Sequence, residues 1–199
     1  MGWTLGFGET GAGALSGVNA MKKIKLLALS GSLRKASYNT AMLEALSELS
    51  PSNVEISIFR KLGELPLFNP DTESESNSVF ESLRSELGRS QGLVIASPEY
   101  AHGISGLMKN ALDWLVGGEE FVDMPVVILN ASPRSNHALN ALKEVVTTMS
   151  GRIIEEACVS LPLLGSGFNS DDIKENPSMA AMLEKALKVF YEEILKEGE

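Results

Sequence analysis

Five short apolar runs, separated by segments of helical periodicity, constrain the fold of this chain more than any other feature. They span residues 24–29, 54–59, 93–96, 126–129 and, less clearly, 153–159. Three of the runs are nearly continuous Val, Ile, Leu and Ala without polar alternation, a pattern typical of parallel strands that are covered on both faces. We therefore expect five strands in a parallel sheet, with helices on both sides.

The segments between the runs carry apolar residues at the spacing of a helix face. They predict helices over residues 42–49, 107–115 and 139–149, a weaker helix over 79–87 and a final helix over 179–194. Right-handed crossovers turn this alternation into an α/β fold with a doubly wound sheet. Five strands favour the flavodoxin-like order 2-1-3-4-5 over the six-stranded Rossmann order, and ligands should bind at the carboxyl ends of the strands.

The charge and the cysteine content exclude several classes of function. The formal net charge is −9 and no Lys/Arg cluster offsets it, so we expect neither nucleic acid nor a membrane as a partner. Cys158 is the single cysteine and cannot form an internal disulfide. With His102 and His137 as the two histidines, a structural zinc site would lack ligands. We expect a cytoplasmic protein without a metal site.

Residues 1–20 do not have the features of a signal peptide or a membrane span, because they lack a positively charged segment and a long apolar run. They contain a G-x-G-x-x-G match at residues 6–11, but the segment before it is too short for the strand that a dinucleotide-binding motif needs. We predict that residues 1–20 are a disordered extension or a remnant of cloning. A single domain is then expected over residues 21–199.

The segment after the first run has the composition of a phosphate-binding loop. Residues 30–39 read S-G-S-L-R-K-A-S-Y-N and lead into the first predicted helix. The glycine allows close backbone approach, Ser32, Ser37 and Asn39 offer hydrogen-bond donors, and Arg34 offers a charged fork for phosphate oxygens. The start of a helix adds free N–H groups and the positive end of the helix dipole. We therefore expect this loop to bind a phosphate group.

A simpler interpretation of this loop is structural. In this interpretation, Ser37 or Asn39 caps the helix, and Arg34 and Lys35 are solvated surface charges.

The spacing of residues excludes two other kinds of phosphate-binding loop. The Walker A pattern G-x-x-x-x-G-K-S/T is absent, and the phosphatase loop needs a nucleophilic cysteine before the Arg, whereas Cys158 lies far along the chain.

A second motif follows the third run and makes a family resemblance specific. Residues 97–114 read S-P-E-Y-A-H-G-I-S-G-L-M-K-N-A-L-D-W. Together with G-S-x-R-x-x-S-x-N in the first loop, this segment resembles the NADPH-dependent FMN reductase family, whose second pattern is P-E-Y-N/A-x-x-x-P-G-x-L-K-N-A-x-D-W. The resemblance spans nearly all of residues 22–199, including the spacing of the strands.

The resemblance implies a flavodoxin-like fold that binds FMN without a covalent link. It implies a ping-pong mechanism, in which NADPH or NADH reduces the flavin and leaves before an oxidised acceptor takes its place. The acceptors that it implies are quinones, azo compounds, free flavins and metal oxyanions such as chromate. Family members with this pattern commonly form homodimers or homotetramers.

Carried onto this chain, the resemblance implies a set of flavin contacts, with no side chain acting as a nucleophile. The phosphate contacts fall on Ser32, Arg34, Ser37 and Asn39, the ring contacts fall on Pro98, Glu99, Tyr100 and the backbone of Ala101, His102 and Gly103, and Ser132 matches a third flavin loop. Two places depart from the family pattern. Ser105 stands where the family usually has Pro, and Asn136 and His137 stand where a pair of glycines is common.

The alternatives that stay open differ in how the cofactor is used. A flavodoxin-like electron carrier would bind FMN but lack a pyridine-nucleotide site, and a binder of phosphate esters would use the first loop alone. His102 is either a proton donor, because imidazole exchanges protons near neutral pH, or a solvent-facing loop residue. Tyr100 is either an aromatic wall for the flavin or an ordinary half-buried side chain.

Overall fold

The predicted strands are present in the computed structural model and form one parallel sheet in the flavodoxin-like order. β1 (Ile24–Ser30) lies between β2 (Val54–Phe59) and β3 (Gly92–Ala96), and β6 (Pro125–Asn130) follows β3. Two short strands, β7 (Arg152–Ile153) and β8 (Val159–Ser160), occupy the fifth position beside β6. The structure describes residues 22–72, 77–134 and 136–196, so the predicted extension over residues 1–20 and its glycine motif lie outside the described residues.

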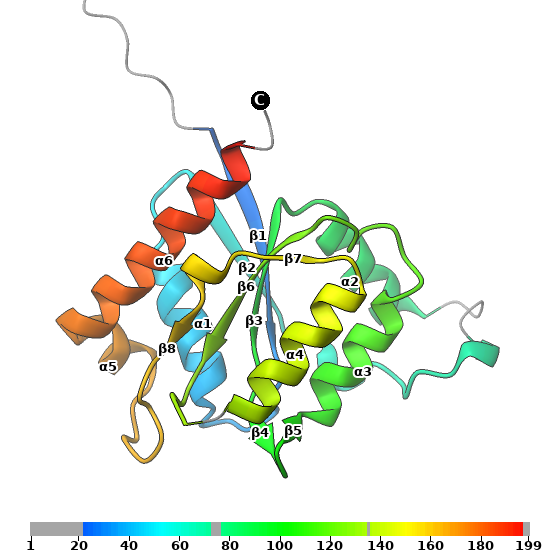
Figure 1. The fold of residues 1–199 in the computed structure, drawn as a ribbon, viewed down its shortest axis with the longest axis horizontal. Coiled ribbons are helices and arrows are strands. Elements are labelled where there is room, and N and C mark those ends of the chain that lie inside the picture. Colours follow the sequence, from blue (N-terminus) through cyan, green and yellow to red (C-terminus); the bar gives the residue numbers. More distant parts are fainter. Residues whose placement is uncertain (1–21, 73–76, 135, 197–199) are drawn as a thin grey trace, which may run out of the picture.

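Helices cover both faces of the sheet, as the continuous apolar runs predict (Figure 1). One face packs against α1 (Tyr38–Glu48), α5 (Ser170–Glu175) and α6 (Pro177–Lys196), and the other packs against α2 (Ser78–Gly88), α3 (Gly106–Leu115) and α4 (Asn136–Thr148). Successive side chains of a strand point to opposite faces. In β1, Leu26 and Ala28 therefore join the first core, whereas Leu27 and Leu29 join the second.

The fifth strand is broken in the middle, which the sequence did not predict. Residues 153–159 are predicted as one strand, the least clear of the five because two glutamates interrupt its apolar residues, and a 3-10 turn (Glu155–Ala157) separates β7 from β8 at this point. Opposite the break, the Ile128 N–H of β6 donates to Cys158 Sγ at 3.4 Å. The single cysteine thus supplies a side-chain acceptor to the sheet where the regular strand is interrupted.

A small hairpin at the carboxyl edge of the sheet was also not predicted by periodicity. β4 (Glu99–Tyr100) pairs with β5 (Gly103–Ile104) in an antiparallel arrangement, below the ends of the central strands in Figure 1. At its tip, Ala101 and His102 have φ values of 48° and 60°. Residues with a side chain seldom adopt this left-handed conformation, so the neighbouring structure must hold the tip in place.

No helix in the described part of the chain is long and apolar enough to cross a membrane. Within the same residues, no group of three or more His, Cys, Asp or Glu side chains is placed so that it could hold a metal ion.

Candidate functional site

The loops after β1, β3 and β6 line one cleft of about 170 Å³ at the carboxyl edge of the sheet, which we call the loop cleft. Parallel strands end at the same edge, so segments that are far apart in the sequence meet there. Eight of the predicted site residues line it: Ser32, Arg34, Ser37, Asn39, Pro98, Glu99, Tyr100 and Ser132. The other three, Ala101, His102 and Gly103, are not part of its lining, since Ala101 and His102 form the tip of the β4–β5 hairpin and Gly103 begins β5.

Sequence reasoning missed five lining residues, which are Tyr38, Ser97, Asn130, Ala131 and Leu164. Ser97 and Ala131 directly follow strands, and Asn130 ends one, so their position at the carboxyl edge was a usable signal. Leu164 belongs to the loop after β8 and is 59% exposed. No local pattern marks it, because its place in the cleft depends on the path of the chain after the broken strand.

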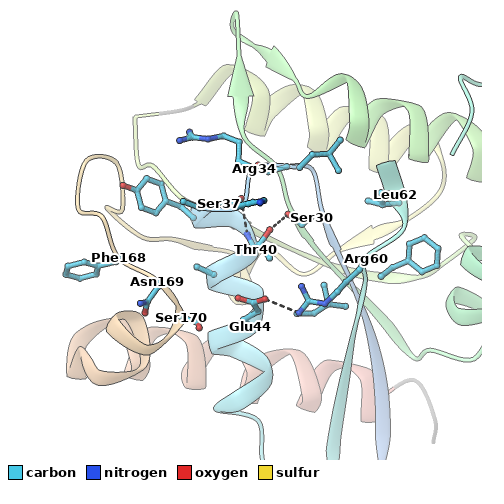
Figure 2. A pocket seen from close by; sticks show the side chains of 18 of the residues that line it. Ser30, Arg34, Ser37, Thr40, Glu44, Arg60, Leu62, Phe168, Asn169 and Ser170 are labelled. Carbon is cyan, nitrogen blue, oxygen red and sulfur yellow. Dashed lines mark hydrogen bonds and ion pairs between the residues drawn. The ribbon is translucent and has the colours of Figure 1, made fainter. Parts of the chain in front are cut away.

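Ser37 caps α1 and also lines the loop cleft. Its buried Oγ accepts the Thr40 N–H at 3.3 Å, so the structural interpretation of the first loop is correct for this residue. Capping uses a lone pair of the oxygen and leaves the hydroxyl hydrogen free to donate to a ligand. The Thr40 and Ser30 side-chain oxygens lie 2.8 Å apart, which ties the helix start to the end of β1 (Figure 2).

Arg34 stands at the mouth of the cleft with an exposed guanidinium group. Its backbone N–H donates to Ser32 Oγ at 3.4 Å, which shapes the turn between them. In the described part of the chain, the Arg34 side chain takes part in no ion pair. Its charged donors are therefore available to an anion.

Asn39 carries a buried acceptor that has no partner. The residue is 6% exposed and lines the loop cleft, and its Oδ1 atom makes no hydrogen bond among the described residues. Leaving a buried acceptor unpaired costs about 1–3 kcal/mol. A donor on a ligand in the cleft would satisfy this atom.

Gly31 is required by packing rather than by the conformation of a turn. A Cβ atom at this position would lie 2.6 Å from Ser97 Oγ and 2.8 Å from Ser105 Oγ. The Ser105 hydroxyl donates to the Gly31 carbonyl oxygen at 2.7 Å and accepts the Met108 N–H at 3.2 Å at the start of α3. The serine that replaces the usual family proline thus joins the loops after β1 and β3.

The second and third loops are held by hydrogen bonds of their own. Glu99 Oε2 accepts the Ala138 N–H at 3.0 Å, and a carboxylate is favourable at this position because it lies at the N-terminus of α4. The buried Asn130 side chain bridges the backbone of Ser132, donating to its carbonyl oxygen at 2.7 Å and accepting its N–H at 3.2 Å. The cleft is therefore largely pre-formed.

His102 and His137 stack on each other, with ring centroids 4.4 Å apart and an interplanar angle of 29°. Both residues are exposed, as the solvent-facing interpretation of His102 predicts. His137 lies in the first turn of α4, at one of the two positions where the family commonly has glycine. His137, which stands where the family commonly has glycine, therefore stacks on His102 at the tip of the hairpin.

The fold and the loop cleft define a flavodoxin-like α/β protein with a ligand site at the carboxyl edge of its sheet. Residues 24–163 match the model of the NADPH-dependent FMN reductase family, and the chain belongs to that family. A solved flavoenzyme NAD(P)H:(acceptor) oxidoreductase from Paracoccus denitrificans has a similar fold, with a TM-score of 0.72 and 23% identity, over 87% of this chain and 98% of that one.

Curated relatives match a shorter part of the chain. A quinone reductase of Escherichia coli is 30% identical over 115 residues, which cover 56% of this chain and 61% of the relative. A quinone reductase of Pseudomonas putida is 36% identical over 121 residues, which cover 55% of this chain and 63% of the relative. The chain thus spans about three fifths of the length of these relatives.

Proposed function

We propose that this chain binds FMN non-covalently in the loop cleft and reduces it with NADPH or NADH. The observation that carries the proposal is the convergence of two groups of residues on one cleft. A polar loop at the start of α1 meets the Pro98, Glu99 and Tyr100 segment there, in a member of the FMN reductase family.

The first loop fits the phosphate and the ribityl chain of FMN. The N-terminus of α1, the Ser32 and Ser37 hydroxyls and the Arg34 guanidinium are donors that suit a phosphate dianion. The unpaired Oδ1 atom of Asn39 is an acceptor and suits a ribityl hydroxyl. The loop therefore offers charge for one end of the ligand and a buried acceptor for its middle.

The hairpin segment fits the flavin ring. Pro98 stiffens the exit from β3, and the peptide groups from residue 99 to 103 can pair with the pyrimidine edge of the ring. Tyr100 is 52% exposed and lines the cleft, so it can offer an aromatic face. Ser132, in the third loop, lines the same cleft and is the last of the proposed flavin contacts.

Bound FMN would supply the redox chemistry, because a flavin accepts a hydride from a reduced nicotinamide and passes two electrons onward. The protein would bind and orient the reactants. Arg34 and the first loop hold the phosphate, and the hairpin fixes the plane of the ring. Tyr100 is exposed, so the end of the cleft that it lines faces solvent. The nicotinamide and the acceptor can bind there one after the other, which is a ping-pong scheme.

Quinones are the first acceptors to test, because the relatives from E. coli and P. putida are named quinone reductases. Azo compounds, free flavins and chromate complete the proposed acceptor range. We further propose a cytoplasmic homodimer or homotetramer formed by the domain over residues 21–199. A chain with a single cysteine suits a reducing compartment.

The test is to mix the purified chain with FMN, desalt it, and record the visible spectrum before and after anaerobic addition of NADPH or NADH. A retained flavin spectrum that bleaches on addition of nucleotide is the expected result. Retained flavin that neither nucleotide bleaches would contradict the reductase function and favour an electron carrier. Loss of the flavin on desalting would contradict the FMN site.

A further inference from the structure

Two contacts join the β4–β5 hairpin to the start of α4, which lies beside it in Figure 1. The Ala138 N–H donates to Glu99 Oε2 at 3.0 Å, and this bond holds the base of the hairpin. The ring of His137 stacks on the ring of His102, with 4.4 Å between the centroids, and this contact holds the tip. The position of the hairpin therefore depends on α4 at both its base and its tip.

The tip needs the second contact because its backbone is strained. Ala101 and His102 have positive φ values and neither is a glycine, so this conformation costs free energy that neighbouring contacts must offset. Both side chains are exposed. Apart from the stack, the His102 ring makes no hydrogen bond or ion pair with the described part of the chain. The stack with His137 is therefore the side-chain contact that holds His102 in place.

Protonation weakens such a stack, because an imidazole ring gains a positive charge as the pH falls from 8 to 5. Two like charges at this separation repel each other, and His137 also lies at the positive end of the α4 dipole. The other charged or titratable groups on the surrounding elements are Glu99 and Tyr100 on β4, Arg134 in the turn before α4, Lys143 and Glu144 on α4, and Lys109 and Asp113 on α3.

These neighbours do not compensate two charged imidazoles. Lys109 and Asp113 pair with each other, and Lys143 pairs with Glu155. Glu99 is the carboxylate that bonds to the same turn of α4 as His137, and one negative charge balances one imidazolium rather than two. The stack is therefore stable while at most one ring is charged, and acid destabilises it.

We propose that the His102–His137 stack is a pH-sensitive clamp on the hairpin, with His137 as a positioning residue for the flavin ring. The inference rests on the proposed function, in which the backbone of residues 101–103 contacts the ring. At pH 8 the neutral rings stack and hold these peptide groups in place. In acid the charged rings separate and release the strained tip, so the flavin loses contacts and its affinity falls. The glycine that the family commonly has at position 137 could not form this clamp.

The direct test is NMR of the flavin-free protein at pH 8 and pH 5, in the parent and in His137→Phe. The phenyl ring cannot be protonated, and it attracts a protonated His102 through a cation–π interaction. We expect nuclear Overhauser contacts between the rings of residues 102 and 137 at both pH values in this variant, but only at pH 8 in the parent. The variant thereby also controls for unfolding of the hairpin in acid. Ring contacts that persist at pH 5 in the parent would overturn the inference.

The effect on the flavin is measured by fluorescence titration with FMN at the same two pH values. Acid also protonates the phosphate of FMN, and this loss is common to all variants. Between pH 8 and pH 5 the parent should lose about fivefold more affinity than His137→Phe, the factor that corresponds to the repulsion of two unit charges 4.4 Å apart in water. His137→Ala should bind FMN more weakly than the parent already at pH 8, with the pH dependence of His137→Phe. Asn140→Ala, exposed on α4, should behave as the parent.

Failure of the clamp is distinct from failure of the proposed function. If FMN binds and is reduced but the parent and His137→Phe lose the same affinity in acid, the clamp fails alone. If FMN is not retained while acid separates the two rings in the parent and not in His137→Phe, the flavin proposal fails and the pH-sensitive stack stands.

Discussion

The hydroxyl of Ser105 donates a 2.7 Å hydrogen bond to the carbonyl oxygen of Gly31, and this contact joins the loop after β3 to the end of β1. The hydroxyl oxygen of Ser105 also accepts the N–H of Met108, in the first turn of α3. Ser105 is 2% exposed, so both bonds are made out of contact with water. A proline at this position, which the family usually has, could make neither bond, because its side chain has no polar atom.

Replacing Ser105 by Ala should therefore destabilise the protein. The variant loses the cap of α3 and leaves the Gly31 carbonyl without its side-chain donor, and each loss costs about 1 kcal/mol or more. We expect the free energy of unfolding in urea to fall by about 2 kcal/mol. Ser178→Ala is the matched control, since Ser178 is exposed and its hydroxyl makes no hydrogen bond that the structure shows. Equal stability of the two variants would contradict the role of Ser105.

Gly31→Ala should destabilise the protein by about 1–3 kcal/mol, because the new methyl group overlaps two serine side chains. Ser97 Oγ is the nearest atom, at 2.6 Å from the Cβ position. Adding Ser97→Ala removes this atom, so the double variant should recover part of the loss in urea denaturation. Gly106→Ala is the control, since no atom lies within 4 Å of the added Cβ. A loss as large at Gly106 as at Gly31 would argue against the steric explanation.

Asn39→Ala should separate ligand binding from stability. Its Oδ1 atom is buried without a partner, so removing it should not lower the thermal stability of the FMN-free protein. In the FMN-bound protein, the same change removes an acceptor, and we expect FMN affinity to fall about tenfold in a fluorescence titration. Asn140→Ala, on the exposed side of α4, should leave the affinity unchanged. An unchanged affinity in Asn39→Ala would remove this residue from the FMN site.

Glu120 and Arg84 should give stability a pH dependence in acid. Two nitrogens of Arg84 donate to Glu120 Oε1, at 2.6 and 3.1 Å, and this hydrogen bonding lowers the pKa of Glu120 below its ordinary value. A carboxyl group with a lowered pKa stabilises the fold above its unfolded-state pKa, and the contribution disappears as the pH falls through the folded-state pKa. Because the pair is partly exposed, we expect Glu120→Gln to cost only about 0.5–1 kcal/mol at pH 7.

Urea denaturation at neutral pH and in acid checks this prediction, since the two proteins should converge in stability once Glu120 is protonated. Glu192→Gln serves as the control, because the exposed pair that it breaks has an N–O separation of 3.9 Å. If the free energy of unfolding of Glu120→Gln differed from that of the parent by the same amount at both pH values, the ion-pair explanation would be contradicted.

Cys158 should react slowly with iodoacetamide in the folded protein. Burial raises the pKa of its thiol, so the thiolate fraction at pH 8 is smaller than that of a free cysteine. We expect a rate at least about tenfold below that of the urea-unfolded chain, measured by mass spectrometry. The chain has a single cysteine, so the modification reports on this site alone. Equal rates in the folded and unfolded protein would show that the thiol is not protected.

Local pattern was sufficient to predict the strands and the long helices, because strands buried on both faces must be apolar throughout and helices must present an apolar stripe. It failed where the chain departs from regular structure. Residues 155–157 were predicted within the fifth strand yet form a 3-10 turn, and the Cys158 thiol accepts the Ile128 N–H opposite that turn. A side-chain acceptor replaces a ladder bond here, and no periodicity encodes this replacement.

For the site, the sequence by itself determined the polar first loop and the Pro98 to Gly103 segment, since both depend on residue types that follow strands in a parallel sheet. The tertiary structure alone decided which of these residues share a cleft. In the tertiary structure Leu164 lines the cleft, whereas His102 lies outside it and stacks on His137 at the hairpin tip. The same packing brings the Ser105 hydroxyl to the Gly31 carbonyl oxygen. These relations depend on distances between segments that are remote in the chain, and only the packing of the sheet and its helices determines such distances.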